Sequence, residues 1–124
     1  MEINELTSSI IKAAFNVHNI LGAGFLEKVY HNALIVELEG MGLKVFSEVP
    51  INVYYKDIKV GDFFADLYIE NIVLIKLKAV ENLASIHEVQ LVNYLNATGE
   101  DIGLLINFGK SVTVKRKFRV NSAE

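Results

Sequence analysis

The chain has 124 residues, 52% of them hydrophobic and 22% charged, with a formal net charge of −3. This length suits one domain with a buried core, residues 1–124, and the composition excludes a disordered chain. The absence of cysteine excludes disulfides, thiolate metal sites and cysteine nucleophiles. No apolar run approaches the ~20 residues that a membrane span requires, so we expect a cytoplasmic protein with no membrane contact. The negative charge argues against a surface that holds nucleic acid non-specifically, although a local basic patch stays open.

Two helices are predicted in the first third of the chain. Apolar residues recur at helical spacing over residues 4–21, with Asn4 or Thr7 as the N-cap. Glycines in residues 22–24 end this helix, since glycine tolerates the left-handed conformation found at helix ends. A second helical pattern covers residues 25–40.

The pattern then changes to strands. Residues 43–55 and 58–60 are predicted as two strands around a turn at Lys56-Asp57. Residues 61–80, GDFFADLYIENIVLIKLKAV, predict a central hairpin that turns at Glu70-Asn71.

A third helix is expected over residues 82–97, with Ser85 as N-cap and Glu88 closing a capping box. The apolar run 102–108 suits an interior strand, and residues 112–120 alternate as a last strand. The elements together predict an α/β fold of order αα-βββ(β)-α-ββ, with a mixed central sheet flanked by helices.

The last strand carries three cations on one side, Lys115, Lys117 and Arg119. Two interpretations stay open. The charges protect a solvated edge strand from aggregation, or they form a basic strip that contacts nucleic-acid phosphates.

Charged residues also occur inside the apolar central hairpin. Asp66 and Glu70 share one face of the first strand, and Lys76 and Lys78 share one face of the second. Buried charges are unfavourable unless they meet each other or an ion. These residues therefore lie on a solvated face or form a site.

Five short motifs occur along the chain in a fixed order. They are GFLEKVY at 24–30, ADL at 65–67, LKAV at 77–80, HEVQLVNYL at 87–95 and INFG at 106–109. Together they resemble the GxxExxY proteins of the PD-(D/E)xK nuclease superfamily, over nearly the whole length. The resemblance implies a restriction-endonuclease-like core and Mg²⁺-dependent hydrolysis of phosphodiester bonds, with DNA as a partner.

The resemblance also implies roles for single residues. Asp66 and an acidic residue two positions before Lys78 would bind Mg²⁺, a hard cation that prefers oxygen ligands. Glu27 would add a ligand or hold a water, and Lys78 would orient the attacking water. Gln90 and Tyr94 match the Gln-x-x-x-Tyr motif of the RecB-like branch and would support this geometry.

Other residues near these motifs have simpler interpretations beside a supporting role. Glu27 also suits the N-terminal end of a helix dipole. Tyr30 is expected to pack with its hydroxyl as a polar handle. His18 either hydrogen-bonds into the site or favours its helix C-terminus as a cation. His87 gathers with Gln90 on one side of the third helix.

Two positions depart from the family pattern. Phe64 stands where the family tends to have Arg, and Lys76 stands where it has Glu. An intact site of three carboxylates and one lysine sums to −2, whereas Glu27, Asp66, Lys76 and Lys78 sum to zero. We therefore expect the Lys76 ammonium to take or crowd the position of the metal and to pair with Asp66, with Glu27 as a further partner.

No nearby acid compensates for Lys76, because Glu70 lies four residues beyond Asp66 and Glu81 lies beyond the strand end. Three hypotheses follow. The first is a nuclease-like protein with an impaired site and weak or no metal binding. The second is a working Mg²⁺-dependent nuclease that tolerates Lys76 or recruits another acid. The third is an interaction domain, with a homodimer as one form.

Overall fold

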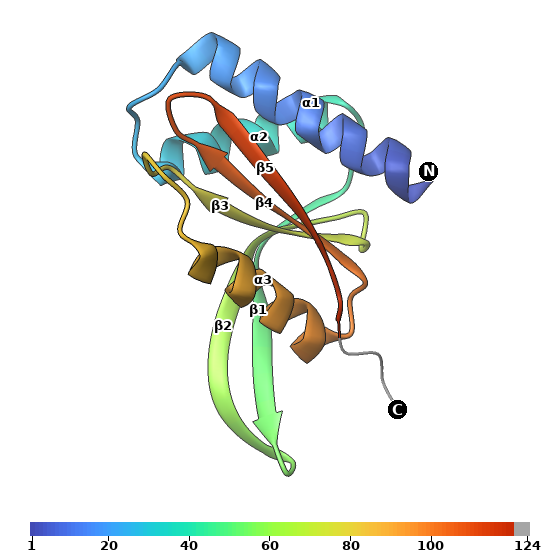
Figure 1. Ribbon diagram of the computed structural model, residues 1–124. Coiled ribbons are helices and arrows are strands. Elements are labelled where there is room, and N and C mark those ends of the chain that lie inside the picture. Colours follow the sequence, from blue (N-terminus) through green and yellow to red (C-terminus); the bar gives the residue numbers. More distant parts are fainter. Residues whose placement is uncertain (121–124) are drawn as a thin grey trace.

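The computed structural model describes residues 1–120. Its elements are α1 (Ile3–Leu21), α2 (Glu27–Gly40), β1 (Val45–Tyr55), β2 (Ile58–Ile69), β3 (Val73–Lys78), α3 (Ser85–Thr98), β4 (Ile102–Phe108) and β5 (Val112–Phe118) (Figure 1). The predicted α/β class and element order are confirmed. No helix in residues 1–120 is both long enough and apolar enough to cross a membrane.

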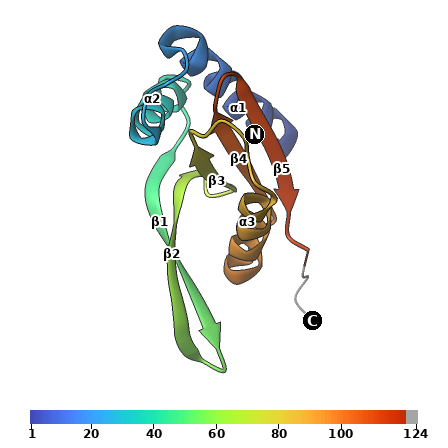
Figure 2. The same ribbon diagram turned by 60° about the vertical axis from the view of Figure 1, so that its left-hand side comes forward.

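The five strands form one sheet in the order β1-β2-β3-β4-β5. Only β3 and β4 run parallel, and the other neighbours are antiparallel. Parallel neighbours need a crossover connection, and α3 supplies it. The mixed central sheet expected from the sequence is therefore confirmed. Helices α1 and α2 cover one face of the sheet and α3 covers the other (Figures 1 and 2).

Strand β4 lies at the centre of the core. All seven of its residues are buried because helices cover both of its faces. Leu104 and Ile106 pack toward α1 and α2, whereas Leu105 packs toward α3. Helix α3 comes close at Gly103, where an added Cβ would lie 2.9 Å from Leu91 Cδ1 and 3.2 Å from the Leu74 carbonyl oxygen. The apolar run at 102–108 thus forms the predicted interior strand.

Strands β1 and β2 form a long arm that extends past the rest of the sheet (Figures 1 and 2). The predicted break between residues 60 and 61 is wrong, because β2 continues from Ile58 to Ile69 and pairs with β1, with one register shift between Val53 and Tyr54. Both predicted turns are confirmed. Lys56 and Asp57 have φ of 51° and 65°, and Glu70 and Asn71 have φ of 54° and 57°. Paired positive φ values are typical of the two-residue turns that join antiparallel strands.

The predicted N-caps are wrong for both helices concerned. Helix α1 begins at Ile3, so Asn4 and Thr7 lie inside it, where the Thr7 hydroxyl donates to the Asn4 carbonyl at 3.2 Å.

Helix α3 begins at Ser85, three residues later than expected, with Ala84 at the cap position. The Ala84 N–H donates to His87 Nδ1 at 3.3 Å. Glu88 closes no capping box with Ser85 and instead pairs with Lys117. The carboxylate that the local pattern assigned to the cap therefore pairs with a lysine of β5 instead.

Candidate active site

The centre of the candidate site is the point where β2 and β3 separate. Leu67 pairs with Ile75, and pairing stops before the next positions, Asp66 and Lys76. Here Asp66 Oδ2 accepts the Leu77 backbone N–H at 2.6 Å. At this point β2 turns away to form the arm and no longer pairs with β3. The Asp66 carboxylate therefore accepts the β3 backbone N–H that would otherwise lack a partner.

The Lys76 ammonium lies between Asp66 and an aromatic ring of α3. Its Nζ is 3.5 Å from Asp66 Oδ2, and the two side chains are only 20% and 21% exposed. The same Nζ lies 5.9 Å from the centroid of the Tyr94 ring, within cation–π range. The expected pairing of Lys76 with Asp66 is present. Among residues 1–120, no ion pair joins Lys76 to Glu27.

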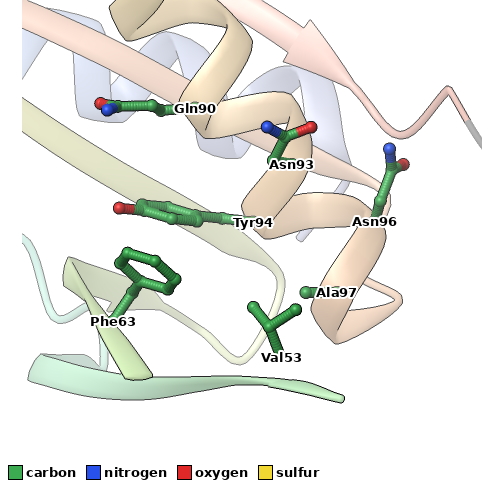
Figure 3. A pocket seen from close by; sticks show the side chains of 7 residues that line it. All are labelled: Val53, Phe63, Gln90, Asn93, Tyr94, Asn96 and Ala97. Carbon is green, nitrogen blue, oxygen red and sulfur yellow. The ribbon is translucent and has the colours of Figure 1, made fainter. Parts of the chain in front are cut away.

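Lys78 and the two residues of the Gln-x-x-x-Tyr motif, Gln90 and Tyr94, belong to the same elements, β3 and α3. Lys78 ends β3 on the same face as Lys76, is partly buried, and makes no ion pair within the described part of the chain. Gln90 and Tyr94 project from successive turns of α3 in the same direction (Figure 3). The fold thus places Lys76 near both Asp66 and Tyr94, with Gln90 one helical turn before Tyr94 on α3.

On the α2 side, Asp66 also lines an open hollow of about 470 Å³. Its lining consists of Leu26, Glu27, Lys28, His31, Glu48 and Asp66. Glu27, the first residue of α2, is exposed. Glu27 and Asp66 therefore line the same hollow. Within residues 1–120, no hydrogen bond joins their two side chains.

Glu48 is an acidic residue of this hollow that the sequence analysis missed. It lies in β1 between Ser47, which pairs with Leu67, and Val49, which pairs with Ala65, so it is opposite Asp66. Its φ of 55° is uncommon for a residue other than glycine. A glutamate within an alternating strand is usually predicted to face solvent, so no local sequence signal indicated that Glu48 lines the hollow.

His31 ties α2 to the backbone of the site. Its Nδ1 lies 3.4 Å from Lys28 Nζ, which only donates, so Nδ1 is the acceptor and Nε2 carries the proton. The Nε2–H then points at the Asp66 carbonyl oxygen and at Ser47 Oγ, each at 3.2 Å. The ring is buried. The shared helical face of Glu27 and His31 was the available sequence signal.

Tyr30 and His18 anchor loops around the site. The Tyr30 hydroxyl donates to the Gly22 carbonyl at 2.6 Å and accepts the Phe25 N–H at 3.2 Å. Its ring stacks on Phe108 with 4.7 Å between centroids. These contacts fix the loop that leads to Glu27, as expected for a packed tyrosine with a polar handle.

His18 Nε2 donates to the Gly109 carbonyl at 2.9 Å, which attaches the β4–β5 turn to α1. At the β4 end, Asn107 is buried and bonds both backbone groups of Val80, at 3.0 Å to its N–H and 2.9 Å to its carbonyl. Within residues 1–120, neither His18 nor His87 has a hydrogen bond to Asp66: His18 bonds to Gly109, and His87 Nδ1 accepts the Ala84 N–H.

Two of the three cations predicted on the last strand have acidic partners, although Arg119 lies one residue beyond the end of β5. Lys117 Nζ lies 3.1 Å from Glu88, and Arg119 lies 2.8 Å from Asp101. Lys115 is exposed and has no ion pair within residues 1–120. The positive strip that was one interpretation of this strand is therefore partly neutralised.

The oxygen and nitrogen donors of the site decide whether it can hold a divalent cation. Mg²⁺ requires near-octahedral oxygen ligands. Within residues 1–120, no three His, Asp or Glu side chains come together in a way that would hold a metal ion. Asp66 Oδ2 already receives the Leu77 N–H and faces the Lys76 ammonium. As they are arranged, these residues do not fit a divalent cation.

Comparison with known proteins agrees with the fold. A family model described as PD-(D/E)XK nuclease superfamily matches residues 4–120. A solved structure titled "Crystal structure of SSO0001" is similar, with a TM-score of 0.60 and 18% identity over 77% of this chain and 52% of that chain. The chain thus spans about half the length of that protein, and at this identity the likeness concerns the fold alone. The search of curated proteins gave no match.

Proposed function

Because the chain belongs to the PD-(D/E)XK nuclease superfamily, we propose that it is a GxxExxY-type nuclease-like domain, residues 1–124, whose metal site is impaired by Lys76. Members of the superfamily generally use divalent metals. The observation that carries the proposal is the Lys76 ammonium 3.5 Å from Asp66 Oδ2. By the resemblance to the GxxExxY proteins, position 76 would hold the family's second acidic ligand. The proposed consequence is weak or absent Mg²⁺ binding and no efficient cleavage of DNA.

Electrostatics supports this proposal. A divalent cation bound to Asp66 would lie close to the positive charge of the Lys76 ammonium. At about 4 Å and an effective dielectric of about 20, that repulsion amounts to several kcal/mol. Glu48 adds negative charge to the hollow, but it is exposed and has no contact with Lys76 within residues 1–120. Glu27, Glu48, Asp66, Lys76 and Lys78 carry a net charge of −1, whereas the same five positions with a glutamate at position 76 would carry −3.

The side chains retain a capacity to bind a phosphodiester. In an intact family site, the bound metal supplies charge neutralisation and activates water. Here Lys76 and Lys78 present two ammonium groups on one face of β3, and Lys115 offers an exposed cation on β5. We expect these groups to attract a phosphate, while Asp66, engaged by Leu77 and Lys76, activates no water.

The test is the change Lys76→Glu, assayed for cleavage of plasmid and linear DNA with Mg²⁺. The present chain should leave DNA intact, and Lys76→Glu should cut it. Lys12→Glu, an equal charge change on the exposed side of α1, is the control and should stay inactive. The proposal fails if the present chain cuts DNA with Mg²⁺ and Asp66→Ala abolishes the cutting, or if a folded Lys76→Glu variant gains neither metal binding nor cleavage.

A second candidate function is an interaction domain, and the β1–β2 arm is the observation that favours it. Tyr54, Tyr55, Ile58 and Val60 at the arm tip are each more than 60% exposed. Exposed apolar patches mark interaction surfaces. Light scattering after size exclusion tests this candidate, which predicts a dimer that Tyr55→Ser weakens. A monomer at all concentrations would contradict it.

A further inference from the structure

A second hollow, of about 490 Å³, lies between the β1–β2 arm and α3. Pockets of this size accommodate small organic ligands. Its lining consists of Val53, Phe63, Gln90, Asn93, Tyr94, Asn96 and Ala97 (Figure 3). It adjoins the candidate site, because Tyr94 forms part of its wall and also contacts Lys76.

The most prominent feature of this hollow is a pair of aromatic rings. Phe63 from β2 and Tyr94 from α3 face each other, with 5.5 Å between centroids and 36° between planes. Figure 3 shows the two rings on opposite sides of the gap between arm and helix, with Gln90 extending alongside Tyr94. At this separation the two rings pack against each other, and the surfaces that they turn toward the hollow are left for a ligand. Phe63 is 43% exposed, so its ring is available to a ligand.

Gly61 makes this ring position possible. A Cβ on Gly61 would lie 3.0 Å from Phe63 Cε2 and 3.3 Å from Val53 Cβ. Contacts this short would make the Phe63 ring or Val53 shift by a few tenths of an ångström. The glycine in the middle of β2 therefore lets the ring fold back over the strand toward α3.

The polar groups around the rings restrict the chemistry of the ligand. Gln90 and Asn93 carry amides that donate and accept hydrogen bonds, and neither has a hydrogen-bond partner within residues 1–120. The Lys76 ammonium lies beyond the Tyr94 ring, 5.9 Å from its centroid. A flat ring system with polar edges and an attached negative charge matches all three features. An apolar peptide or lipid would match only the rings.

We propose that this hollow binds one unstacked nucleobase of single-stranded or frayed nucleic acid, with its phosphate on the side of Lys76. The inference rests on the proposed function in taking nucleic acid as the ligand. Base–aromatic stacking is sequence-tolerant, because every base has a flat face. A base inside a duplex must first be unstacked, so the hollow should prefer single strands.

The experiment is a titration of the full chain into short single-stranded DNA that carries one 2-aminopurine, in EDTA so that no cleavage occurs. The chain has no tryptophan, which leaves the fluorescence of the base clear to follow. Stacking on Phe63 and Tyr94 should quench this fluorescence with a saturable dependence on protein concentration. A matched duplex should bind more weakly.

Two variants test the pocket itself. Phe63→Ala should weaken binding by about 5- to 50-fold, the range expected for loss of one stacking surface. Phe64→Ala is the matched control, because Phe64 is the next residue of β2, is 54% exposed and does not line the hollow. Its affinity should stay within twofold, about the usual reproducibility of such titrations. Gly61→Ala, which shifts the Phe63 ring or Val53, should also weaken binding.

The outcomes separate the two proposals. Equal binding by Phe63→Ala and Phe64→Ala, or an unquenched base, overturns the base pocket but leaves nucleic-acid binding elsewhere on the chain. No binding of either DNA form overturns the pocket and the phosphate-binding part of the proposed function together. A dimer that Phe63→Ala dissociates and DNA does not disturb shows that a second copy fills the hollow, which also overturns the proposal.

Discussion

Replacement of Asp66 by alanine should destabilise the protein in the absence of any metal. Asp66 Oδ2 accepts the Leu77 N–H at 2.6 Å, and a hydrogen bond to a charged acceptor contributes about 1.5–3 kcal/mol. The ion pair with Lys76, only partly exposed, adds about 0.5–1 kcal/mol. We therefore expect Asp66→Ala to lower the free energy of unfolding by about 2–4 kcal/mol.

Urea unfolding in EDTA measures this quantity. Asp66→Asn keeps an oxygen that accepts the Leu77 N–H and should lose only about 1 kcal/mol. Glu27→Ala is the control, because Glu27 is exposed at the start of α2 and contributes about 0.3–1 kcal/mol through the helix dipole. In a metal site with excess carboxylates, removing one relieves repulsion. An Asp66→Ala protein as stable as the original, or more stable, would refute the claim that Lys76 and Leu77 satisfy this carboxylate.

Two further predictions concern stability. Asn107→Ala should lower the free energy of unfolding by about 2 kcal/mol, because it leaves both backbone groups of Val80 without their partner. Urea unfolding measures this loss. The control Asn32→Ala, at an exposed position, should show almost no change. Burial, with the hydrogen bond and negative charge of Glu100, raises the pKa of Tyr68 to about 12. The unfolded pKa is about 10, so this stabilisation is full below about pH 10 and is lost as the pH rises through about 12. Unfolding at about pH 9 and about pH 11 should therefore show a larger loss of stability for the original chain than for Tyr68→Phe, and equal losses would contradict this.

The sequence predicted those elements whose signal is local. Residues 102–108 are apolar at every position and form the buried central strand, and the helical stripes of α1 and α2 pack on one face of the sheet. Positive-φ turns at residues 56–57 and 70–71 were also visible, because they separate alternating segments. The pairing of Lys76 with Asp66 was predicted from the family resemblance together with the charges of the two side chains.

Features that depend on pairing between distant segments were missed. Glu48 joins the hollow only because β1 lies opposite Asp66 in register, and nothing in its own neighbours indicates this. Glu88 was assigned to a cap, but it pairs with Lys117 on β5. Phe63 belongs to a pocket only because Gly61 lets its ring approach α3. In each case a tertiary partner decided the role of a residue that local patterns left open.

The most direct test of the central claim is a calorimetric titration of Mg²⁺ into the original chain and into Lys76→Glu under identical conditions. Our account predicts no saturable heat for the original chain, whose Lys76 ammonium already neutralises Asp66, and binding of Mg²⁺ by the variant. Saturable binding by the original chain that Asp66→Ala removes would contradict it.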